Sequence, residues 1–186
     1  MIGKVNRCFS AIKNKYYFDG NEVVFSPLHV YQYTIFLYFL ANTLFVNTKN
    51  RSLCDRIYAL SKIISGMDLY YEVEMPDIFF CDHPVGSVIG RGKFGNYFSF
   101  VQGCTVGNNK GIFPEFGERV VMLSDSKVLG KCKIGSNVII AANTYIKDTD
   151  IPDNSIVFGS SPDLCIKTNL KGYIDNIIQE KFMFTF

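Results

Sequence analysis

The chain has only two histidines, and one of them stands in a segment that could do acid–base chemistry. His83 follows Asp82 directly, within the segment Phe79–Gly86. A neutral imidazole can accept a proton near neutral pH, which a hydroxyl group needs if its oxygen is to act as a nucleophile. His29 has no obvious acidic partner in the sequence. A lone histidine is more often a plain turn residue, so the pattern around His83 has to decide its role.

The composition excludes several classes of protein. A formal net charge of +2 over 186 residues is too small for a concentrated nucleic-acid-binding face. The six cysteines include no C-x-x-C pair, which predicts neither a zinc site nor a disulfide scaffold. The first residues lack the apolar core of a signal peptide. We therefore expect a reduced, cytoplasmic protein without a bound metal.

The first third of the chain predicts a helical hairpin. Ser26 before Pro27 is typical of a helix start, so we expect a helix over residues 27–47. Ser52, followed three residues later by an aspartate, resembles a capping box that begins a second helix. Gly66 is a natural stop for that helix. Residues 27–65 are therefore expected to form a helical hairpin.

The first of these helices is unusually apolar, because no charged residue occurs between His29 and Lys49. A membrane span needs about 20 apolar residues. This stretch reaches that length only if five polar residues are included, which favours a helix packed on its own protein. Peripheral association with the inner face of a membrane is the alternative.

Large apolar residues recur every six positions in the second half of the chain. They are Phe116, Met122, Val128, Ile134, Ile140 and Ile146. Small or β-branched residues stand two positions before the last five, at Val120, Ser126, Cys132, Val138 and Thr144. Upstream, Phe94, Phe100 and Val106 keep the same period, and 107–115 interrupts it as an inserted loop. A period of six is typical of hexapeptide β-helices, although an ordinary all-β domain with accidental spacing is the alternative.

The repeat predicts a mainly β protein: a left-handed parallel β-helix of hexapeptide repeats, with an N-terminal helical hairpin and a short C-terminal helix. Each hexad would form one side of a triangular coil, with the large residue inward. Coils would stack at the spacing of a β-sheet, about 4.8 Å. We expect an N-terminal helical region over 1–66, the β-helix over 67–165, and a C-terminal tail or helix over 166–186.

The ordered motifs around His83 resemble those of the serine acetyltransferase family of hexapeptide enzymes. Asp82–Gly86 matches its Asp-His-x-x-Gly segment, and Val88–Gly90 continues the match. Phe100–Gly107 is similar to its I-L-Q-x-V-T-L-G stretch. Ile64–Asp68 is similar to the L-x-G-I-D segment that precedes its β-helix. The resemblance covers roughly residues 30–165 and implies transfer of an acetyl group from acetyl-CoA to a hydroxyl.

The resemblance implies a catalytic dyad of His83 and Asp68, because the family's catalytic histidine is oriented by an aspartate fifteen residues earlier. Such a carboxylate would fix the tautomer of the imidazole and stabilise the imidazolium. A slightly shortened first coil would place the two side chains side by side. Asp82 corresponds to the family's acidic residue that contacts the acceptor, although a solvated turn aspartate would look the same.

The resemblance also implies a homotrimer that binds acetyl-CoA in a groove between adjacent β-helices. The carried-over contacts to the cofactor fall at the end of Phe100–Gly107 and on three later positions: Gly107, Asn108, Ser124 and Ala142. Small side chains let the pantetheine arm approach the backbone, which Asn108 does less well than the glycine of the family. Lys147 or Lys110 would meet the phosphates of CoA.

The chain departs from the family at the site that binds the amino acid. Serine acetyltransferases carry an Arg-His pair before the proline that restarts the repeats, and its arginine binds the carboxylate of serine. Here Ile112 and Phe113 precede Pro114. Because no guanidinium stands at this place, we expect the acceptor to be a sugar in surface-polysaccharide biosynthesis, with Phe113 as its aromatic platform.

Three alternatives stay open at this point. The first is serine O-acetyltransferase itself, the enzyme of cysteine biosynthesis. The second, from another class, is a non-catalytic β-helix that only binds a partner. The third, a β-helical carbonic anhydrase, needs three histidine ligands, whereas only one histidine lies in the repeat region.

Overall fold

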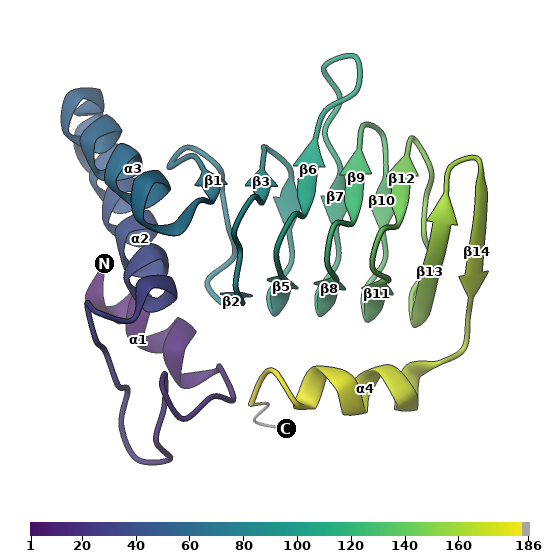
Figure 1. The fold of residues 1–186 in the computed structure, drawn as a ribbon, viewed down its shortest axis with the longest axis horizontal. Coiled ribbons are helices and arrows are strands. Elements are labelled where there is room, and N and C mark those ends of the chain that lie inside the picture. Colours follow the sequence, from purple (N-terminus) through teal and green to yellow (C-terminus); the bar gives the residue numbers. More distant parts are fainter. Residues whose placement is uncertain (184–186) are drawn as a thin grey trace.

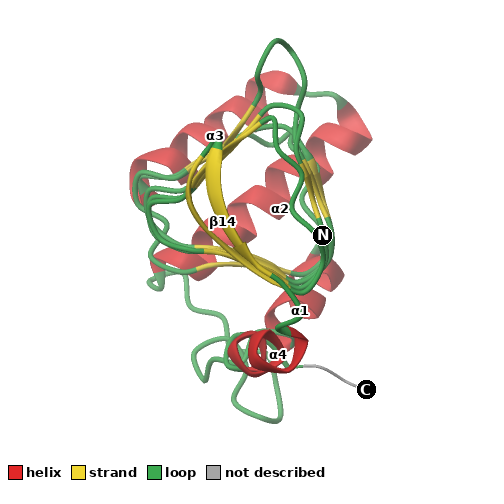
Figure 2. Cartoon of the chain, turned by 90° about the vertical axis from the view of Figure 1, so that its right-hand side faces the viewer, coloured by secondary structure: helices red, strands yellow, loops and turns green. Residues whose placement is uncertain are grey.

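The computed structural model describes residues 1–183, which form a left-handed parallel β-helix of about five turns with helices at one end and along one side (Figure 1). Viewed along its axis, the β-helix is triangular (Figure 2). One row of parallel strands is β1 (Asp68–Leu69), β3 (Val88–Ile89), β6 (Thr105–Gly107), β9 (Lys127–Leu129) and β12 (Tyr145–Lys147). The second is β2 (Phe79–Cys81), β5 (Phe98–Phe100), β8 (Val120–Met122), β11 (Val138–Ile140) and β13 (Ser155–Ser160). The third is β4 (Lys93–Phe94), β7 (Glu115–Phe116) and β10 (Lys133–Ile134).

The register of the strands shows how long each coil is. Lys127 pairs with Tyr145, eighteen residues later, as three hexads require. Thr105 pairs with Lys127, a longer step of twenty-two residues. The extra residues form the loop between β6 and β7, which stands out from the prism as expected from the interrupted repeat (Figure 1).

The column of large residues at period six fills the interior of the β-helix. Each of its six members is at most 6% exposed: Phe116, Met122, Val128, Ile134, Ile140 and Ile146. The five small residues of the second column are at most 2% exposed. Apolar burial of this kind is the main favourable term in folding, so the predicted fold is confirmed together with its physical basis.

The helical hairpin is confirmed, but both helix starts differ from the expectation. α2 (Val30–Thr48) begins three residues late, because the ring of His29 and not Ser26 accepts a hydrogen bond from a backbone N–H of the first turn. α3 (Arg51–Ser65) is capped by Asn50, whose side chain accepts from the N–H of the third helical residue. The expected capping box at Ser52 is therefore wrong. Gly66 ends α3 in the left-handed conformation, as predicted.

α2 packs on its own protein, as the polar residues within its apolar stretch predict. Ile35, Tyr38 and Phe39 belong to the same buried core as the first strands of the β-helix. The hydroxyl of Tyr38 donates a hydrogen bond of 2.7 Å to the carbonyl of Val73. Within residues 1–183, no helix has both the length and the apolarity that crossing a bilayer demands.

Two further helices brace the prism. α1 (Ile2–Ser10) lies beside the hairpin, within the expected helical region of residues 1–66 but in a stretch to which the sequence assigns no individual element. α4 (Lys171–Gln179) does not cover the last coil but runs along the outside of the β-helix, with Ile174 and Ile178 fully buried (Figure 1). The last coil instead ends in an antiparallel hairpin of β13 with β14 (Asp163–Lys167). The expected C-terminal helix is therefore present but shorter, and residues 184–186 of that expectation lie outside the described part.

Gly117 provides a direct test of coil stacking. A Cβ added there would lie 2.5 Å from Oγ of Ser136 and 2.7 Å from its backbone nitrogen, in the next coil. We expect Gly117→Ala to lower the free energy of unfolding by about 1–3 kcal/mol, the usual cost of overpacking. Gly172→Ala in α4 is the matched control: a Cβ there meets nothing within 4 Å, so the change should be neutral or stabilising. Urea denaturation followed by circular dichroism measures both, and equal stabilities would contradict the stacking.

Candidate active site

His83 occupies the tight turn that joins β2 to β3. Its backbone has a φ of 47°, the left-handed conformation that recurs in the turns between strands of this chain, for example at Asp125 and Asn143. Pro84 follows it, and Gly86 takes a φ of 75° to complete the turn. The side chain of His83 is 73% exposed, so its ring is available to a ligand.

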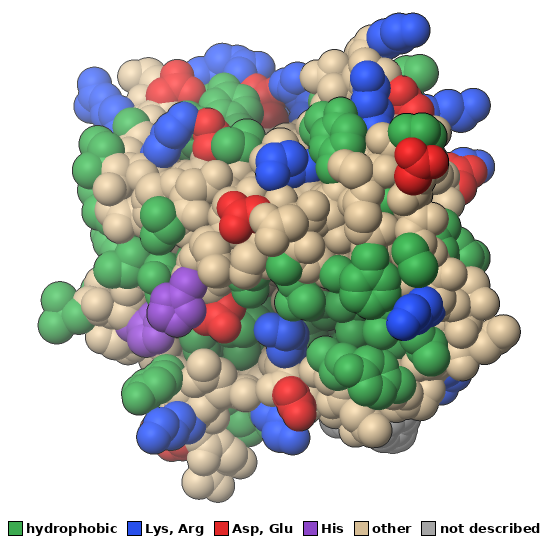
Figure 3. Space-filling view, turned by 45° about the vertical axis from the view of Figure 1, so that its right-hand side comes forward, with side chains coloured by type: hydrophobic (Ala, Val, Ile, Leu, Met, Phe, Trp, Pro, Cys, Tyr) green, Lys and Arg blue, Asp and Glu red, His purple; other side chains and the backbone are tan. Residues whose placement is uncertain are grey.

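The ring of His83 contacts Tyr31 of α2. The hydroxyl oxygen of Tyr31 lies 3.1 Å from Nδ1 of His83, and the two rings meet edge to face at 5.1 Å. On the other side of the ring, a carboxylate oxygen of Asp82 lies 3.7 Å from Nε2. His29 lies next to Tyr31, so both histidines come together on one face of the molecule (Figure 3). A hydroxyl that accepts the proton on Nδ1 leaves the lone pair on Nε2, the state that a general base requires.

Tyr31 should act as a positioning residue for His83. We expect Tyr31→Phe to lower kcat for acetyl transfer about 2- to 10-fold, the value of one net hydrogen bond, while KM stays unchanged. Tyr33→Phe, on the same helix, is the control, because the hydroxyl of Tyr33 makes no contact with His83. Steady-state kinetics measure both variants across pH. Wild-type kcat in Tyr31→Phe would show that this hydroxyl does not orient the base.

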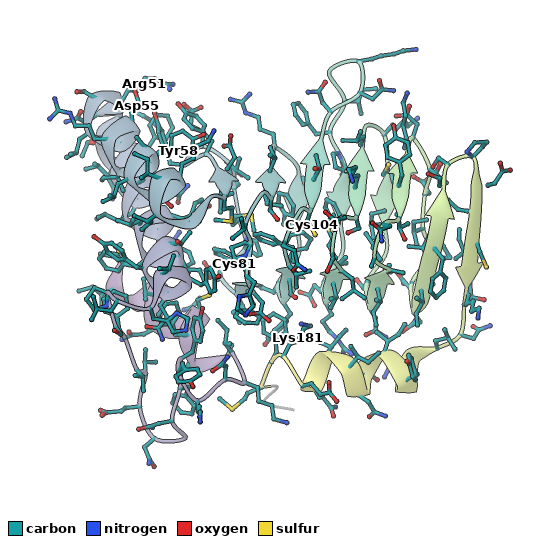
Figure 4. The ribbon with its side chains drawn as sticks, in the orientation of Figure 1. Arg51, Asp55, Tyr58, Cys81, Cys104 and Lys181 are labelled. Carbon is teal, nitrogen blue, oxygen red and sulfur yellow. The ribbon has the colours of Figure 1, made fainter. Side chains whose placement is uncertain are left out.

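Asp68 is the first residue of β1 and lies against α3. Its carboxylate accepts a hydrogen bond of 2.5 Å from the hydroxyl of Tyr58 and one of 2.5 Å from Nζ of Lys62 (Figure 4 labels Tyr58). Partial burial opposes ionisation of Asp68, but these two hydrogen bonds outweigh it and lower the pKa of the carboxyl. Asp68 is therefore ionised at neutral pH, and its contribution to stability is lost only as the pH falls through that lowered pKa.

His83 and Asp68 do not contact each other within one chain. The register explains why: Asp68 pairs with Val88 in the next coil, twenty residues later, so the first coil is longer than three hexads and not shorter. The partners of Asp68 are Lys62 and Tyr58, whereas the partner of Nδ1 in His83 is Tyr31. The geometric expectation that placed the dyad within one prism is wrong, although the role of each residue stays a prediction.

Asp68 and Phe113 line a common hollow of about 290 Å³. Asn108 borders the same hollow, and its side-chain oxygen accepts a hydrogen bond from the N–H of Gly111 that shapes the inserted loop. Arg91, which follows β3, also lines it. The hexapeptide period alone does not predict Arg91 as a member of the site, because the inserted loop lengthens the coil that sets Arg91 against Phe113.

Two of the residues carried over for CoA share an edge of the prism with His83. Ser124 follows β8 and Ala142 follows β11, just as His83 follows β2. The backbone of successive turns is hydrogen bonded along this edge, with the N–H of Asn143 donating to the carbonyl of Ser124 at 2.8 Å. Ala142 is exposed and Ser124 is half-buried, so a ligand can approach the backbone there. We name this the His83 edge.

The other residues carried over for CoA lie on the next edge of the prism. Gly107 ends β6, Asn108 follows it, and Lys147 ends β12. The N–H of Gly130 donates to the carbonyl of Gly107 at 3.0 Å, which stacks the turns of this second edge. Asn108 and Lys147 are exposed. Because Asn108 also borders the hollow of Asp68 and Phe113, we name this the Asn108 edge.

Two cysteines of the β-helix are structural. Cys81 and Cys104 are fully buried in successive coils, where burial raises the pKa of both thiols (Figure 4). A thiol with a raised pKa supplies little thiolate and is a poor nucleophile. Within residues 1–183, no three His, Cys, Asp or Glu side chains are grouped closely enough to hold a metal ion.

Curated proteins with similar sequences are serine acetyltransferases. The chain is 30% identical over 132 residues to the serine acetyltransferase of Staphylococcus aureus, a match that covers 68% of this chain and 61% of that protein. It is 33% identical over 108 residues to the one from Staphylococcus epidermidis, covering 55% of this chain and 50% of that protein. The chain thus spans only half to three fifths of the length of these relatives. No model of a protein family matches it.

Solved structures of similar shape carry the same name. Serine acetyltransferase isoform 3 of Entamoeba histolytica, in complex with cysteine, is 26% identical, with a TM-score of 0.70 over 93% of this chain and 63% of that one. The Neisseria gonorrhoeae enzyme gives a TM-score of 0.75 at 21% identity, over 94% and 70% of the two chains. A serine acetyltransferase in complex with CoA gives 0.72 at 20% identity, over 89% and 69%. The last two likenesses concern the fold alone.

The repeats, the triangular coils and the turn of His83 define a left-handed β-helix protein of the hexapeptide-repeat class. Within that class, the chain is a serine acetyltransferase-like protein.

Proposed function

We propose that the chain is an acetyl-CoA-dependent O-acetyltransferase whose acceptor is serine. The observation that carries this proposal is the sequence match of 30% over 132 residues to a serine acetyltransferase, which includes the Asp82-His83 turn and the hexapeptide repeats. A neighbour of the same fold binds CoA, which supports acetyl-CoA as the co-substrate. The relatives' name favours serine over the sugar that the loss of the Arg-His pair led us to expect.

The residues of the site suit direct acetyl transfer. His83 takes the proton of the acceptor hydroxyl on Nε2 as the oxygen attacks the carbonyl carbon of the thioester. A carbon–oxygen bond forms, the carbon–sulfur bond breaks, and the imidazolium returns its proton to the sulfur of CoA. The products are the acetyl ester and free CoA. Asp68 would stabilise the positive charge on His83 in the transition state.

His83 and the hollow of Asp68 and Phe113 lie apart within one chain, which favours an assembly in which neighbouring chains complete the site. We propose a homotrimer in which the His83 edge of one chain faces the Asn108 edge and the adjoining hollow of the next. The pantetheine arm would then run between them, with the turns of Ser124 and Ala142 on one wall and those of Gly107 and Lys147 on the other. Closed rings are the usual result of such head-to-tail contacts. Acetyl-CoA and six free cysteines suit a cytoplasmic protein.

A sugar acceptor is the second candidate, because Ile112 and Phe113 present apolar side chains where the family carries charged ones. Ile112 is 48% exposed in the inserted loop. An assay of CoA release with acetyl-CoA compares L-serine with nucleotide-linked and lipid-linked sugars. We expect turnover of serine with kcat/KM at least tenfold above that of any sugar. A sugar that exceeds serine would overturn the proposal, as would the absence of turnover with all acceptors.

A further inference from the structure

Arg91 provides a positive charge in the hollow that Phe113 lines. It follows β3 and borders the hollow of about 290 Å³ together with Asp68 and Phe113. Two adjoining hollows, of about 230 and 240 Å³, also have Arg91 in their walls. Arg91 thus lies in the walls of three neighbouring hollows near the N-terminal end of the β-helix.

The strand register places Arg91 one coil away from Phe113. Lys93 pairs with Glu115, and the N–H of Lys93 donates to the carbonyl of Pro114 at 3.1 Å. The same register continued by two residues sets Arg91 against Phe113. Phe113 occupies the position of the histidine in the family's Arg-His pair. The guanidinium of Arg91, from the preceding coil, therefore lies beside the position at which the family carries its arginine.

The N–H groups of the Arg91 guanidinium are available to a ligand. Its nearest carboxylate oxygen belongs to Glu72, at 3.7 Å, too far for a hydrogen bond. Glu72 also forms an ion pair with Arg51, so one carboxylate is shared by two cations. Arg91 is 61% exposed and donates no side-chain hydrogen bond within residues 1–183. A planar guanidinium in this state is suited to bind a carboxylate through two parallel hydrogen bonds.

We propose that Arg91 binds the carboxylate of the acceptor amino acid, in place of the missing arginine before Pro114; this inference rests on the proposed serine O-acetyltransferase activity. It makes Arg91 the residue that distinguishes serine from a neutral hydroxyl compound. The size of the hollow suits a small amino acid, since it lies at the lower limit of ligand pockets.

The test compares L-serine with L-serinamide, which has the same hydroxyl and amine but no carboxylate. We expect Arg91→Ala to raise KM for serine about 10- to 100-fold, the value of charge-assisted hydrogen bonds, and to leave kcat/KM for serinamide within twofold of wild type. Arg91→Lys should give a KM for serine between those of wild type and Arg91→Ala, because lysine keeps the positive charge but cannot donate two parallel hydrogen bonds. Lys93→Ala is the matched control: it removes a neighbouring exposed cation that pairs with Glu115.

A second readout separates this inference from the proposed activity. Ligand-observed NMR with L-serine in the presence of CoA reports binding without turnover. Serine that binds wild type but not Arg91→Ala supports the inference even if no acetyl transfer occurs. Equal losses for serine and serinamide in Arg91→Ala, or unchanged kinetics with both, overturn it while acetyl transfer by wild type stands. A wild-type protein that neither binds nor acetylates serine overturns both.

Discussion

Replacing His83 with alanine is expected to lower kcat for acetyl transfer by about 10²–10⁴-fold, the usual contribution of a general base. The physical reason is that a serine hydroxyl stays protonated at neutral pH and must lose its proton as it attacks the thioester. His83 is exposed at a turn and lies outside the buried core, so the variant should keep its fold. Stopped assays of CoA release measure the loss, and circular dichroism checks the fold.

His29 offers a matched control for His83, since both imidazoles flank Tyr31 on the same face. The ring of His29 caps α2, and asparagine is a good N-cap, so His29→Asn should keep the helix. We expect this variant to retain kcat within a few-fold of wild type. Near-wild-type transfer by His83→Ala, or an equal loss in both variants, would remove His83 from the mechanism.

The second large effect is expected for Asp68→Asn, which should lower kcat by a similar factor, about 10²–10⁴-fold. An amide has nearly the shape of the carboxylate but cannot stabilise a developing imidazolium. Because the two groups act as a unit, the double variant with His83→Ala should be scarcely worse than either single one. Asp77→Asn, which breaks the exposed ion pair with Arg7, is the control and should retain activity.

Mixed assemblies test whether the two groups meet across chains. Neither His83→Ala nor Asp68→Asn chains alone should be active. Where the chains mix at random in a closed ring, about a quarter of the interfaces carry both intact groups. We therefore expect co-expression to restore roughly that fraction of activity. No recovery in mixed assemblies of proven composition would contradict a site shared between neighbouring chains.

The repeat could be predicted from the sequence because every coil needs a large apolar residue on each side to fill its interior. Phe116, Met122 and Val128 each fill the interior of one side, so a polar residue at any of them would leave an unpaired group in a dry core. Helix starts follow weaker rules. Several side chains near the start of a helix can accept a hydrogen bond from a free N–H of its first turn. In the structure His29 caps α2 in place of Ser26, and Asn50 caps α3 in place of Ser52.

The site could be predicted only in part, because its members depend on coil lengths. The period of six identifies which residues point inward, but one or two extra residues in a coil change which outward side chains are neighbours. The pairing of Asp68 with Val88 separated it from His83, and the longer coil of the inserted loop brought Arg91 beside Phe113. Tyr31 contacts His83 because α2 packs against the first coil. This contact between residues far apart in the chain cannot be predicted from local sequence spacing.

The identity of the product tests the central claim most directly. Purified protein is incubated with L-serine, a mixture of nucleotide sugars and acetyl-CoA that carries a ¹³C-labelled acetyl group, and the products are identified by mass spectrometry. The account predicts labelled O-acetylserine, formed in step with free CoA and absent when His83→Ala replaces the wild type. Label that appears only in a sugar, or that stays on CoA, would contradict it.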